Sequence, residues 1–185
     1  SYKKNQLPFK FIKQTRDEGL KKFIRNCPAN SSAILVSKER YVNSGGCNEN
    51  FISPDQVLFL RLFSSGSAVF LNQIVARLPD VQSTDRLSSQ IRRSRYESIL
   101  ALINLCEENP KLEKVYTKLA YRRALSRANN YYRYFTKIRF SKYWFMYLAS
   151  KLFFPNFYKK YMYESLKVFT DNHIERPKKW ETRAS

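Results

Sequence analysis

Histidine is almost missing from this sequence, because His173 is the only one among 185 residues. A Ser–His–Asp triad or a histidine-rich metal site therefore lacks its main component. Cysteine is scarce as well: Cys27, Cys47 and Cys106 are odd in number, lie far apart and form no C-x-x-C motif. These features argue against a disulfide framework and a zinc site, and they favour a reducing compartment. We therefore expect a cytoplasmic protein.

Long hydrophobic runs are also absent. The longest apolar run, YWFMYLAS, is interrupted by Lys151 and is far shorter than the about 20 residues that a membrane-spanning helix needs. The first residues are charged and polar, so they show no signal-peptide pattern, and no initiator Met precedes Ser1. We expect the sequence to be part of a longer protein.

Acidic residues are outnumbered, with 15 Asp and Glu against 34 Lys and Arg and a formal net charge of +19. Residues 1–88 contribute +6 and residues 89–185 contribute +13. A strongly positive chain favours polyanionic partners, namely nucleic acid, nucleotide phosphates or anionic lipid. The charge alone does not distinguish these three.

The first part of the chain mixes helical and strand patterns. Residues 1–26 form a basic amphipathic segment, in which Gly19 weakens the helical pattern. Residues 32–37, SAILVS, are compact and β-branched, which is typical of a buried strand. A turn follows, where Gly45 and Gly46 permit positive φ or a close backbone approach. The apolar side of the first short helix is expected to comprise Phe11, Leu20, Phe23 and Ile24.

A helix start is clearly marked at residues 53–56. Ser53 suits the N-cap, Pro54 suits the first helical position, and Gln56 could close a capping box with Ser53. The helix continues through VLFLRLF and stops near residues 64–66. It is apolar nearly all round, so we expect it to be buried.

The remainder is mainly helical in pattern. Residues 68–78 indicate one or two short strands, and residues 79–87 a polar loop. Helices are then expected from Ser88 or Ser89 to Cys106, over residues 111–136, from Ser141, and from Pro155. The first of these should bury Ile91, Ile99, Leu102, Ile103 and Cys106. The order of elements indicates an α/β fold with a mostly helical C-terminal extension, divided as residues 1–88, 89–175 and a loose tail over 176–185.

Asp55 stands in the first turn of the expected buried helix. Unpaired backbone N–H groups and the helix dipole favour its ionised form, so one interpretation is purely structural. The other interpretation is chemical. A carboxylate held firmly at a pocket rim can accept the proton of an alcohol as that alcohol attacks an electrophile.

Residues 27–72, CPANSSAILVSKERYVNSGGCNENFISPDQVLFLRLFSSGSAVFLN, resemble the acceptor-side region of family 2 glycosyltransferases. That family shows a strand, a twin glycine followed by Asp-Glu, an acidic pair and an apolar helix containing Leu-Arg-Leu. This chain has Gly45 and Gly46, then Asn48-Glu49, Pro54-Asp55 and Leu60-Arg61-Leu62. The resemblance covers roughly residues 27–90.

The resemblance implies part of a GT-A type fold and an inverting transfer of sugar from a nucleoside-diphosphate sugar to an acceptor hydroxyl. Asp55 would be the catalytic base, and Gly45, Gly46 and Glu49 would line the acceptor side. A sugar or a lipid-linked molecule would be the acceptor. The complete enzyme would use Mg²⁺ or Mn²⁺, with ligands outside this chain.

The sequence also departs from the family pattern. Pro54 replaces the usual glutamate, and Leu78 stands near the place where many relatives have a histidine. No D-x-D motif occurs, so the carboxylates that would hold the metal under the leaving diphosphate are missing. We therefore expect this chain to be the C-terminal piece of an enzyme, or to pair with a separate donor half, and to be inactive alone.

Three further arginines and Arg61 have two interpretations each. Residues 90–95, QIRRSR, are similar to the Gln-x-x-Arg-Trp motif of processive relatives, so Arg92, Arg93 or Arg95 could contact the donor phosphate. The alternative for these is a basic, solvated helix face. Arg61 could serve the site or could be a structural partner for buried carboxylates or helix ends.

The C-terminal half is both aromatic and basic. Between Tyr131 and Tyr163 nearly every second residue is aromatic, and Lys and Arg lie between them. Such residues can pack helices together, bind a membrane interface, or stack bases and hold phosphates. The alternatives to an enzyme are thus a peripheral membrane module, at the inner face of the plasma membrane, or a nucleic-acid-binding module, of which nucleic acid is the less favoured.

Overall fold

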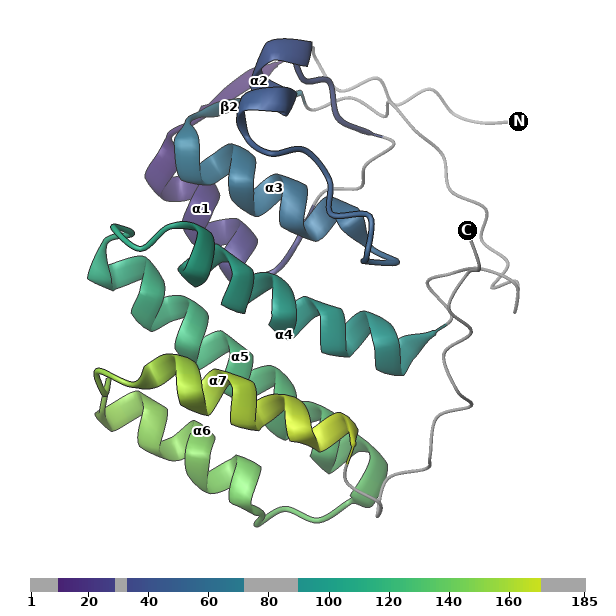
Figure 1. Ribbon diagram of the computed structural model, residues 1–185, viewed down its shortest axis with the longest axis vertical. Helices are drawn as coiled ribbons and strands as arrows, with labels where there is room; N and C mark the ends of the chain where they lie inside the picture. Colours follow the sequence, from purple (N-terminus) through teal and green to yellow (C-terminus); the bar gives the residue numbers. More distant parts are fainter. Residues whose placement is uncertain (1–9, 29–32, 72–89, 171–185) are drawn as a thin grey trace. The chain divides into compact units, whose positions relative to one another are not determined.

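The computed structural model describes residues 10–28, 33–71 and 90–170 (Figure 1). The chain divides into two compact units, Ser1–Ser89 and Gln90–Ser185, here called unit 1 and unit 2. Apart from a two-stranded antiparallel sheet, the regular elements of the described residues are helices. The expected mostly helical C-terminal part is therefore confirmed. The expected tail over 176–185 lies outside the described residues.

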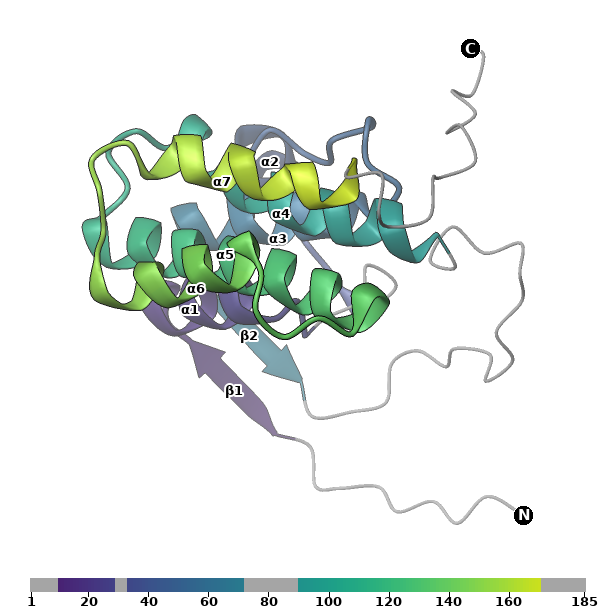
Figure 2. The ribbon, with the colours of Figure 1, turned by 90° about the horizontal axis from the view of Figure 1, so that it is seen from below.

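The described part of unit 1 contains two short strands and three helices. In chain order they are β1 (Phe11–Gln14), α1 (Arg16–Arg25), α2 (Lys38–Asn43), α3 (Pro54–Ser65) and β2 (Ala68–Leu71). The two strands pair antiparallel, with Phe11 opposite Leu71, as the two arrows in Figure 2 show. The expected strands over 68–78 are confirmed as far as Leu71, and the rest of that range lies outside the described residues.

The core of unit 1 lies between α1 and α3. Phe23 of α1 packs against two rings of α3, with centroids 5.0 Å from Phe59 and 4.7 Å from Phe63. Gly19 belongs to this contact, because a Cβ there would lie 2.1 Å from the Phe63 ring. The glycine that weakened the helical pattern thus lets the two helices approach closely.

The start of α3 agrees with the sequence in position but not in capping. Ser53 is the N-cap and Pro54 the first helical residue, as predicted. The predicted capping box is wrong, since no side-chain hydrogen bond caps this helix. The helix is buried on most sides, as expected, at Val57, Leu58, Phe59, Leu60, Leu62 and Phe63.

Three other predictions in unit 1 are wrong. Residues 33–37 form no strand: Leu35 is fully exposed, and Ser37 instead caps α2 by accepting a hydrogen bond from Arg40 N at 3.2 Å. The turn expected after residue 37 therefore begins with a short helix. Phe11 lies in β1 with 65% of its surface exposed, rather than on the apolar side of α1. A strand needs a neighbouring strand that binds its backbone N–H and C=O groups. Composition alone did not identify which segment would have such a neighbour.

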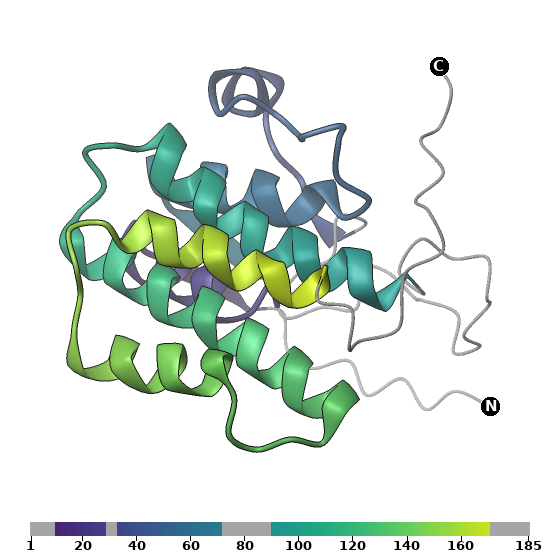
Figure 3. The same cartoon turned by 60° about the horizontal axis from the view of Figure 1, so that its bottom comes forward.

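Over residues 90–170, unit 2 is a bundle of four helices followed by a 3₁₀ turn. The elements are α4 (Ile91–Glu108), α5 (Lys114–Thr136), α6 (Lys142–Leu152), α7 (Tyr158–Leu166) and η3 (Lys167–Phe169). The long helix α5 contacts each of the other three, and α4 also contacts α7 (Figure 3). The four expected helices are confirmed, but two of their starts differ. The N-cap of α4 is Gln90 rather than Ser88 or Ser89, and α7 begins at Tyr158 rather than Pro155. Ser141 caps α6 by accepting from Trp144 N at 3.2 Å.

The interior of unit 2 is formed largely by α4 and α5. The predicted buried residues of α4 are confirmed except Ile91, which is exposed because it is the first residue of the helix and the buried run begins at Glu97. On α5, Ala120, Ala124 and Ala128 are buried at helical spacing, so the neighbouring helices can approach closely. No helix in the described ranges combines the length and the apolar character needed to cross a membrane.

Candidate functional site

Asp55 occupies the first turn of α3, immediately after Pro54. Its side chain is partly exposed, whereas the apolar residues that follow it in α3, from Val57 to Phe63, are buried. Among the described residues the carboxylate has no hydrogen-bond or ion-pair partner. A carboxylate on the first turn of a well-packed helix has a fixed position and can still accept a proton.

The twin glycine adopts a backbone conformation that favours glycine. Gly45 has φ 81° and Gly46 has φ 59°, both in the left-handed region. Gly46 N donates to Tyr41 O at 3.0 Å, and Gly45 N donates to Val42 O at 2.9 Å. These bonds close the C-terminal end of α2. Of the two possibilities that the sequence left open, positive φ is therefore observed at both glycines.

Arg61 connects this loop to α3 by hydrogen bonds. Its Nη1 donates to the carbonyl oxygens of Gly45 at 2.7 Å and of Gly46 at 2.9 Å. A second bond holds the loop to α2, because Cys47 N donates to the hydroxyl oxygen of Tyr41 at 3.1 Å. The helix that begins next to Asp55 thus also carries the group that binds the loop. Of the two interpretations of Arg61, the structure supports a structural partner, although of loop carbonyls rather than of carboxylates.

Two further arginines, which the sequence did not single out, bind the other end of α3. Arg40 Nη2 donates to Leu62 O at 3.2 Å, and Arg16 Nε donates to Ser64 O at 2.7 Å. The last carbonyls of a helix lack partners within the helix and carry the negative end of its dipole. These contacts anchor α3 to α1 and α2, which no local pattern could have indicated.

Glu49 is exposed in the loop between the twin glycine and α3. The loop turns at Asn48, whose Oδ1 accepts from Asn50 N at 3.1 Å, and then enters the core at Phe51. No measured contact joins Glu49 to Asp55. The structure therefore brings Gly45, Gly46 and Arg61 together by hydrogen bonds and leaves Glu49 as a solvated neighbour in the same loop.

The arginines at the start of α4 belong to unit 2. Arg93 Nε lies 2.9 Å from Oε1 of Glu97, a carboxylate that is 4% exposed and needs a partner. Arg92 is half-buried, and Arg95 is exposed. The ion pair of Arg93 supports the structural interpretation for that residue, and Arg95 supports the solvated-face interpretation.

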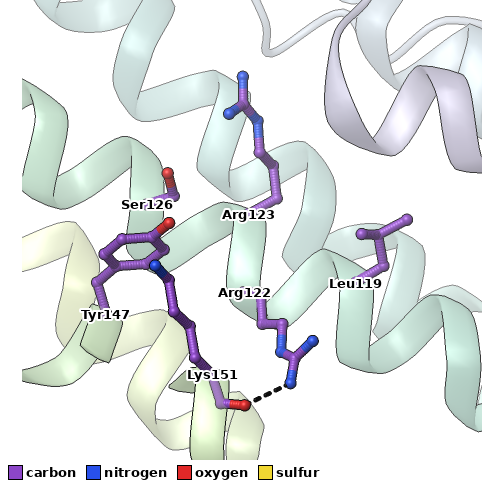
Figure 4. A pocket seen from close by; sticks show the side chains of 6 residues that line it. All are labelled: Leu119, Arg122, Arg123, Ser126, Tyr147 and Lys151. Atoms are coloured by element: carbon purple, nitrogen blue, oxygen red, sulfur yellow. Dashed lines mark hydrogen bonds between the residues drawn. The ribbon is translucent and has the colours of Figure 1, made fainter. Parts of the chain in front are cut away.

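A cationic pocket that sequence reasoning missed lies between α5 and α6. Its volume is about 460 Å³, and Figure 4 shows the side chains around it. The lining residues are Leu119, Arg122, Arg123, Ser126, Tyr147 and Lys151. Tyr147 and Lys151 are one helical turn apart on α6, but only the packing of α6 on α5 brings them beside the two arginines.

Two features of this pocket are electrostatic. Burial, together with the charge of Arg95, lowers the pKa of Arg123 from its ordinary value, which still leaves a guanidinium charged at neutral pH. Lys151 Nζ lies 4.7 Å from the centre of the Tyr147 ring. Arg122 has a different role: its Nε and Nη2 donate to Ser150 O at 2.9 Å and Lys151 O at 2.7 Å, which fixes the end of α6 on α5.

Neither unit offers an evident metal site within the described ranges. No group of three or more His, Cys, Asp or Glu side chains gathers closely enough to hold an ion in residues 10–28, 33–71 and 90–170. Mg²⁺ and Mn²⁺ prefer clustered oxygen ligands, and the described residues bring no such cluster of three or more together. The residues described here do not fit either metal.

The comparisons with known proteins leave the site to be interpreted on its geometry. No family model, curated protein or solved structure matches this chain.

Proposed function

We propose that this chain is the acceptor-side part of an inverting glycosyltransferase with a partial GT-A type fold. It would act with a nucleotide-binding half that lies elsewhere, on the same protein or on a separate one. The proposal rests first on the resemblance of residues 27–90 to family 2 glycosyltransferases. It includes a cytoplasmic location, in keeping with three cysteines that form no disulfide.

One structural observation carries the proposal further than the sequence does. Arg61, in the helix that has Asp55 in its first turn, binds both carbonyls of the twin-glycine loop. A catalytic carboxylate must keep its position relative to the groups that hold the reacting alcohol. A loop bonded to the helix of the carboxylate meets this requirement within one compact unit.

The chemistry assigned to Asp55 is proton removal. An acceptor hydroxyl attacks the anomeric carbon of the donor sugar, and a new carbon–oxygen bond forms on the face opposite the leaving group. The bond to the nucleoside diphosphate breaks, and its electron pair leaves with the phosphate oxygen. Asp55 takes the hydroxyl proton as that hydroxyl becomes acidic during attack, so an ordinary carboxylate is a sufficient base.

The donor phosphates and a divalent metal have no binding groups assigned in unit 1. Mg²⁺ or Mn²⁺ would neutralise the leaving diphosphate in the complete enzyme, and its ligands would come from the nucleotide-binding half. Arg92, Arg93 and Arg95 stay candidates for phosphate contact, of which Arg95 is the most accessible. The proposed chemistry of this chain involves only the acceptor hydroxyl and Asp55.

The test is a transferase assay with the nucleotide-binding half present, measuring release of nucleoside diphosphate from a panel of nucleotide sugars. We expect Asp55→Asn to lower kcat by about 10²–10⁴-fold, the usual effect of removing a general base. KM for the nucleotide sugar should change little, because Asp55 contacts the acceptor side.

Asp17→Asn provides a matched control. Asp17 is also a first-turn helix acid, and it pairs with Lys21 at the surface of α1. Both variants should lose a similar helix-dipole contribution, about 0.3–1 kcal/mol of unfolding free energy. Near-full activity of Asp55→Asn, or an equal loss in both variants, would show that Asp55 is only a helix-end residue.

A further inference from the structure

Helix α6 has a large exposed apolar side. The helix packs mainly on α5, and of its own residues only Tyr143 and Ser150 are buried. Phe145 is 60% exposed and Leu152 is 72% exposed. We name Phe140, Trp144, Phe145, Leu148 and Leu152 the α6 outer face.

The members of the α6 outer face form one continuous strip. Phe145, Leu148 and Leu152 are spaced by three and four residues, so they lie along the same side of the helix. The ring of Trp144 connects them to the preceding loop, with centroids 4.9 Å from Phe145 and 5.0 Å from Phe140. A contiguous apolar strip on a protein surface marks an interaction site.

The charges around this strip are all positive. No Asp or Glu occurs between Glu113 and Glu164, so neither α5 nor α6 carries a carboxylate. Exposed cations stand at both ends of α6, Lys142 at the first turn and Lys151 at the last. A helix with aromatic and aliphatic residues on one side and lysines flanking them suits the boundary between lipid headgroups and acyl chains.

The cationic pocket lies next to the α6 outer face. Tyr147 and Lys151 line the pocket, and each is followed directly by a leucine of the strip, Leu148 and Leu152. Tyr147 and Lys151 therefore form one row on the helix surface, and Leu148 and Leu152 form the row next to it. In Figure 4 the Lys151 ammonium and the Ser126 hydroxyl lie on the same side as the Tyr147 ring. Ammonium, guanidinium and hydroxyl groups are the donors that bind phosphate oxygens.

We propose that unit 2 docks on membranes rich in acidic phospholipid, with the α6 outer face in the interface and a lipid phosphate at the α5–α6 pocket. Lys151 and Ser126 would contact the phosphate beside the Tyr147 ring, Arg123 would add positive charge at the pocket, and Arg122 would hold α6 in place. This inference concerns unit 2 and does not rest on the glycosyltransferase proposal.

Two other occupants fit the surface less well. Nucleic acid stacks on flat aromatic rings, whereas two of the five residues of the strip, Leu148 and Leu152 at its far end, are aliphatic. A second copy of the chain would bring two surfaces without carboxylates together, and their like charges would repel. Acidic lipid offers both the negative charge and the apolar phase.

The test is flotation of the full chain with vesicles. One set contains phosphatidylglycerol and phosphatidylcholine, and the other contains phosphatidylcholine alone. We expect binding to the acidic set only. The double variant Phe145→Gln with Leu152→Gln should weaken that binding by at least about tenfold, since two exposed side chains lose their transfer into lipid. Val115→Gln, at an aliphatic residue that is exposed outside the strip, should change it by less than about twofold.

A lysine pair tests the pocket separately from total charge. Lys151→Gln and Lys111→Gln remove the same charge, and both side chains are exposed, so both variants should fold, which circular dichroism will check. We expect about a fivefold loss for Lys151→Gln and less than about twofold for Lys111→Gln. At matched ionic strength, inorganic phosphate should release the chain from vesicles more effectively than chloride.

Several results would overturn the proposal. These are absence of binding to acidic vesicles, equal losses for the two lysine variants, or an effect of Val115→Gln as large as that of the double variant. Tight binding of inorganic phosphate with vesicle binding insensitive to the apolar variants would indicate a soluble phosphate ligand instead. If the apolar variants weaken binding to single-stranded DNA as strongly as binding to vesicles, the surface serves nucleic acid.

Discussion

At the scale of single residues, three arginine side chains of unit 1 supply hydrogen-bond donors to backbone carbonyl oxygens. Arg16, Arg40 and Arg61 donate to carbonyl oxygens at a helix end or in a loop. A carbonyl that is half-buried without a partner costs about 1–3 kcal/mol. Part of the arginine content of this chain is therefore structural, because these side chains use hydrogen-bond donors on the backbone while they keep their charge.

Arg61 gives the first prediction. Arg61→Ala should lower the unfolding free energy by about 1.5–3 kcal/mol, because two carbonyls of the twin-glycine loop lose a charged donor. Urea denaturation followed by circular dichroism measures this. Arg25→Ala, at an exposed arginine at the end of α1, is the control and should cost less than about 1 kcal/mol. Equal effects for the two arginines would mean that the loop is not held by Arg61.

Cys106 gives the second prediction, which concerns pH. Burial is the main cause that raises the pKa of its thiol to about 11, although Lys159 and Tyr158 act in the opposite direction. A raised thiol pKa keeps the unreactive protonated form, so near pH 8 only about one molecule in a thousand carries the thiolate. Cys27 and Cys47 are only partly buried.

We expect iodoacetamide to modify Cys27 and Cys47 at least about tenfold faster than Cys106 in the folded chain, as read by peptide mass spectrometry. The rate at Cys106 should keep rising with pH up to about 11. In urea the three rates should become similar. Fast modification of Cys106 near neutral pH in the folded chain would contradict the burial described here.

At the scale of elements, the sequence predicted what local chemistry decides. Ser53 and Pro54 marked the start of α3, and Ser141 marked that of α6, because caps act within a few residues. The strand expected over residues 32–37 failed because a strand needs a partner distant in sequence. The partner of β2 is β1, from a segment expected to be helical. For the candidate site, the sequence named Asp55 and the twin glycine, whose role in catalysis stays a prediction. The bonds of Arg61 and the α5–α6 pocket could not be predicted, because they depend on packing.

The contact of α1 with α3 gives the third prediction. Gly19→Ala places a methyl group about where the Phe63 ring lies, since the Cβ would be 2.1 Å from that ring. We expect the unfolding free energy to fall by about 1–3 kcal/mol, as for other overpacked cores. Thermal and urea denaturation measure this loss.

A double variant tests the cause. If overpacking is responsible, Phe63→Leu should cost stability alone but should recover part of the loss when combined with Gly19→Ala, giving a coupling of about 0.5–3 kcal/mol. Strictly additive losses would instead assign the effect of Gly19→Ala to something other than its contact with Phe63.

At the scale of the whole molecule, the two compact units carry different surfaces. Unit 1 contains the candidate catalytic carboxylate and the loop bound to its helix. Unit 2 contains most of the excess positive charge and the α6 outer face. If both proposals hold, the proton removal at Asp55 and the attachment to a membrane belong to separate parts of the chain.

The net charge of +19 gives the last prediction, because it attracts every polyanion at low salt and so obscures specificity. Salt separates the two kinds of binding. Charge attraction is screened as the Debye length falls from about 10 Å at 0.1 M to about 3 Å at 1 M, whereas transfer of apolar side chains into lipid is not screened.

The logarithm of the affinity for single-stranded DNA should therefore fall steeply and linearly with the logarithm of the salt concentration. Binding to acidic vesicles should level off at a residual value that depends on Phe145 and Leu152. Titrations of the same protein against both ligands at increasing salt measure this, and a vesicle affinity that falls as steeply as the DNA affinity would remove the apolar contribution on which membrane docking depends.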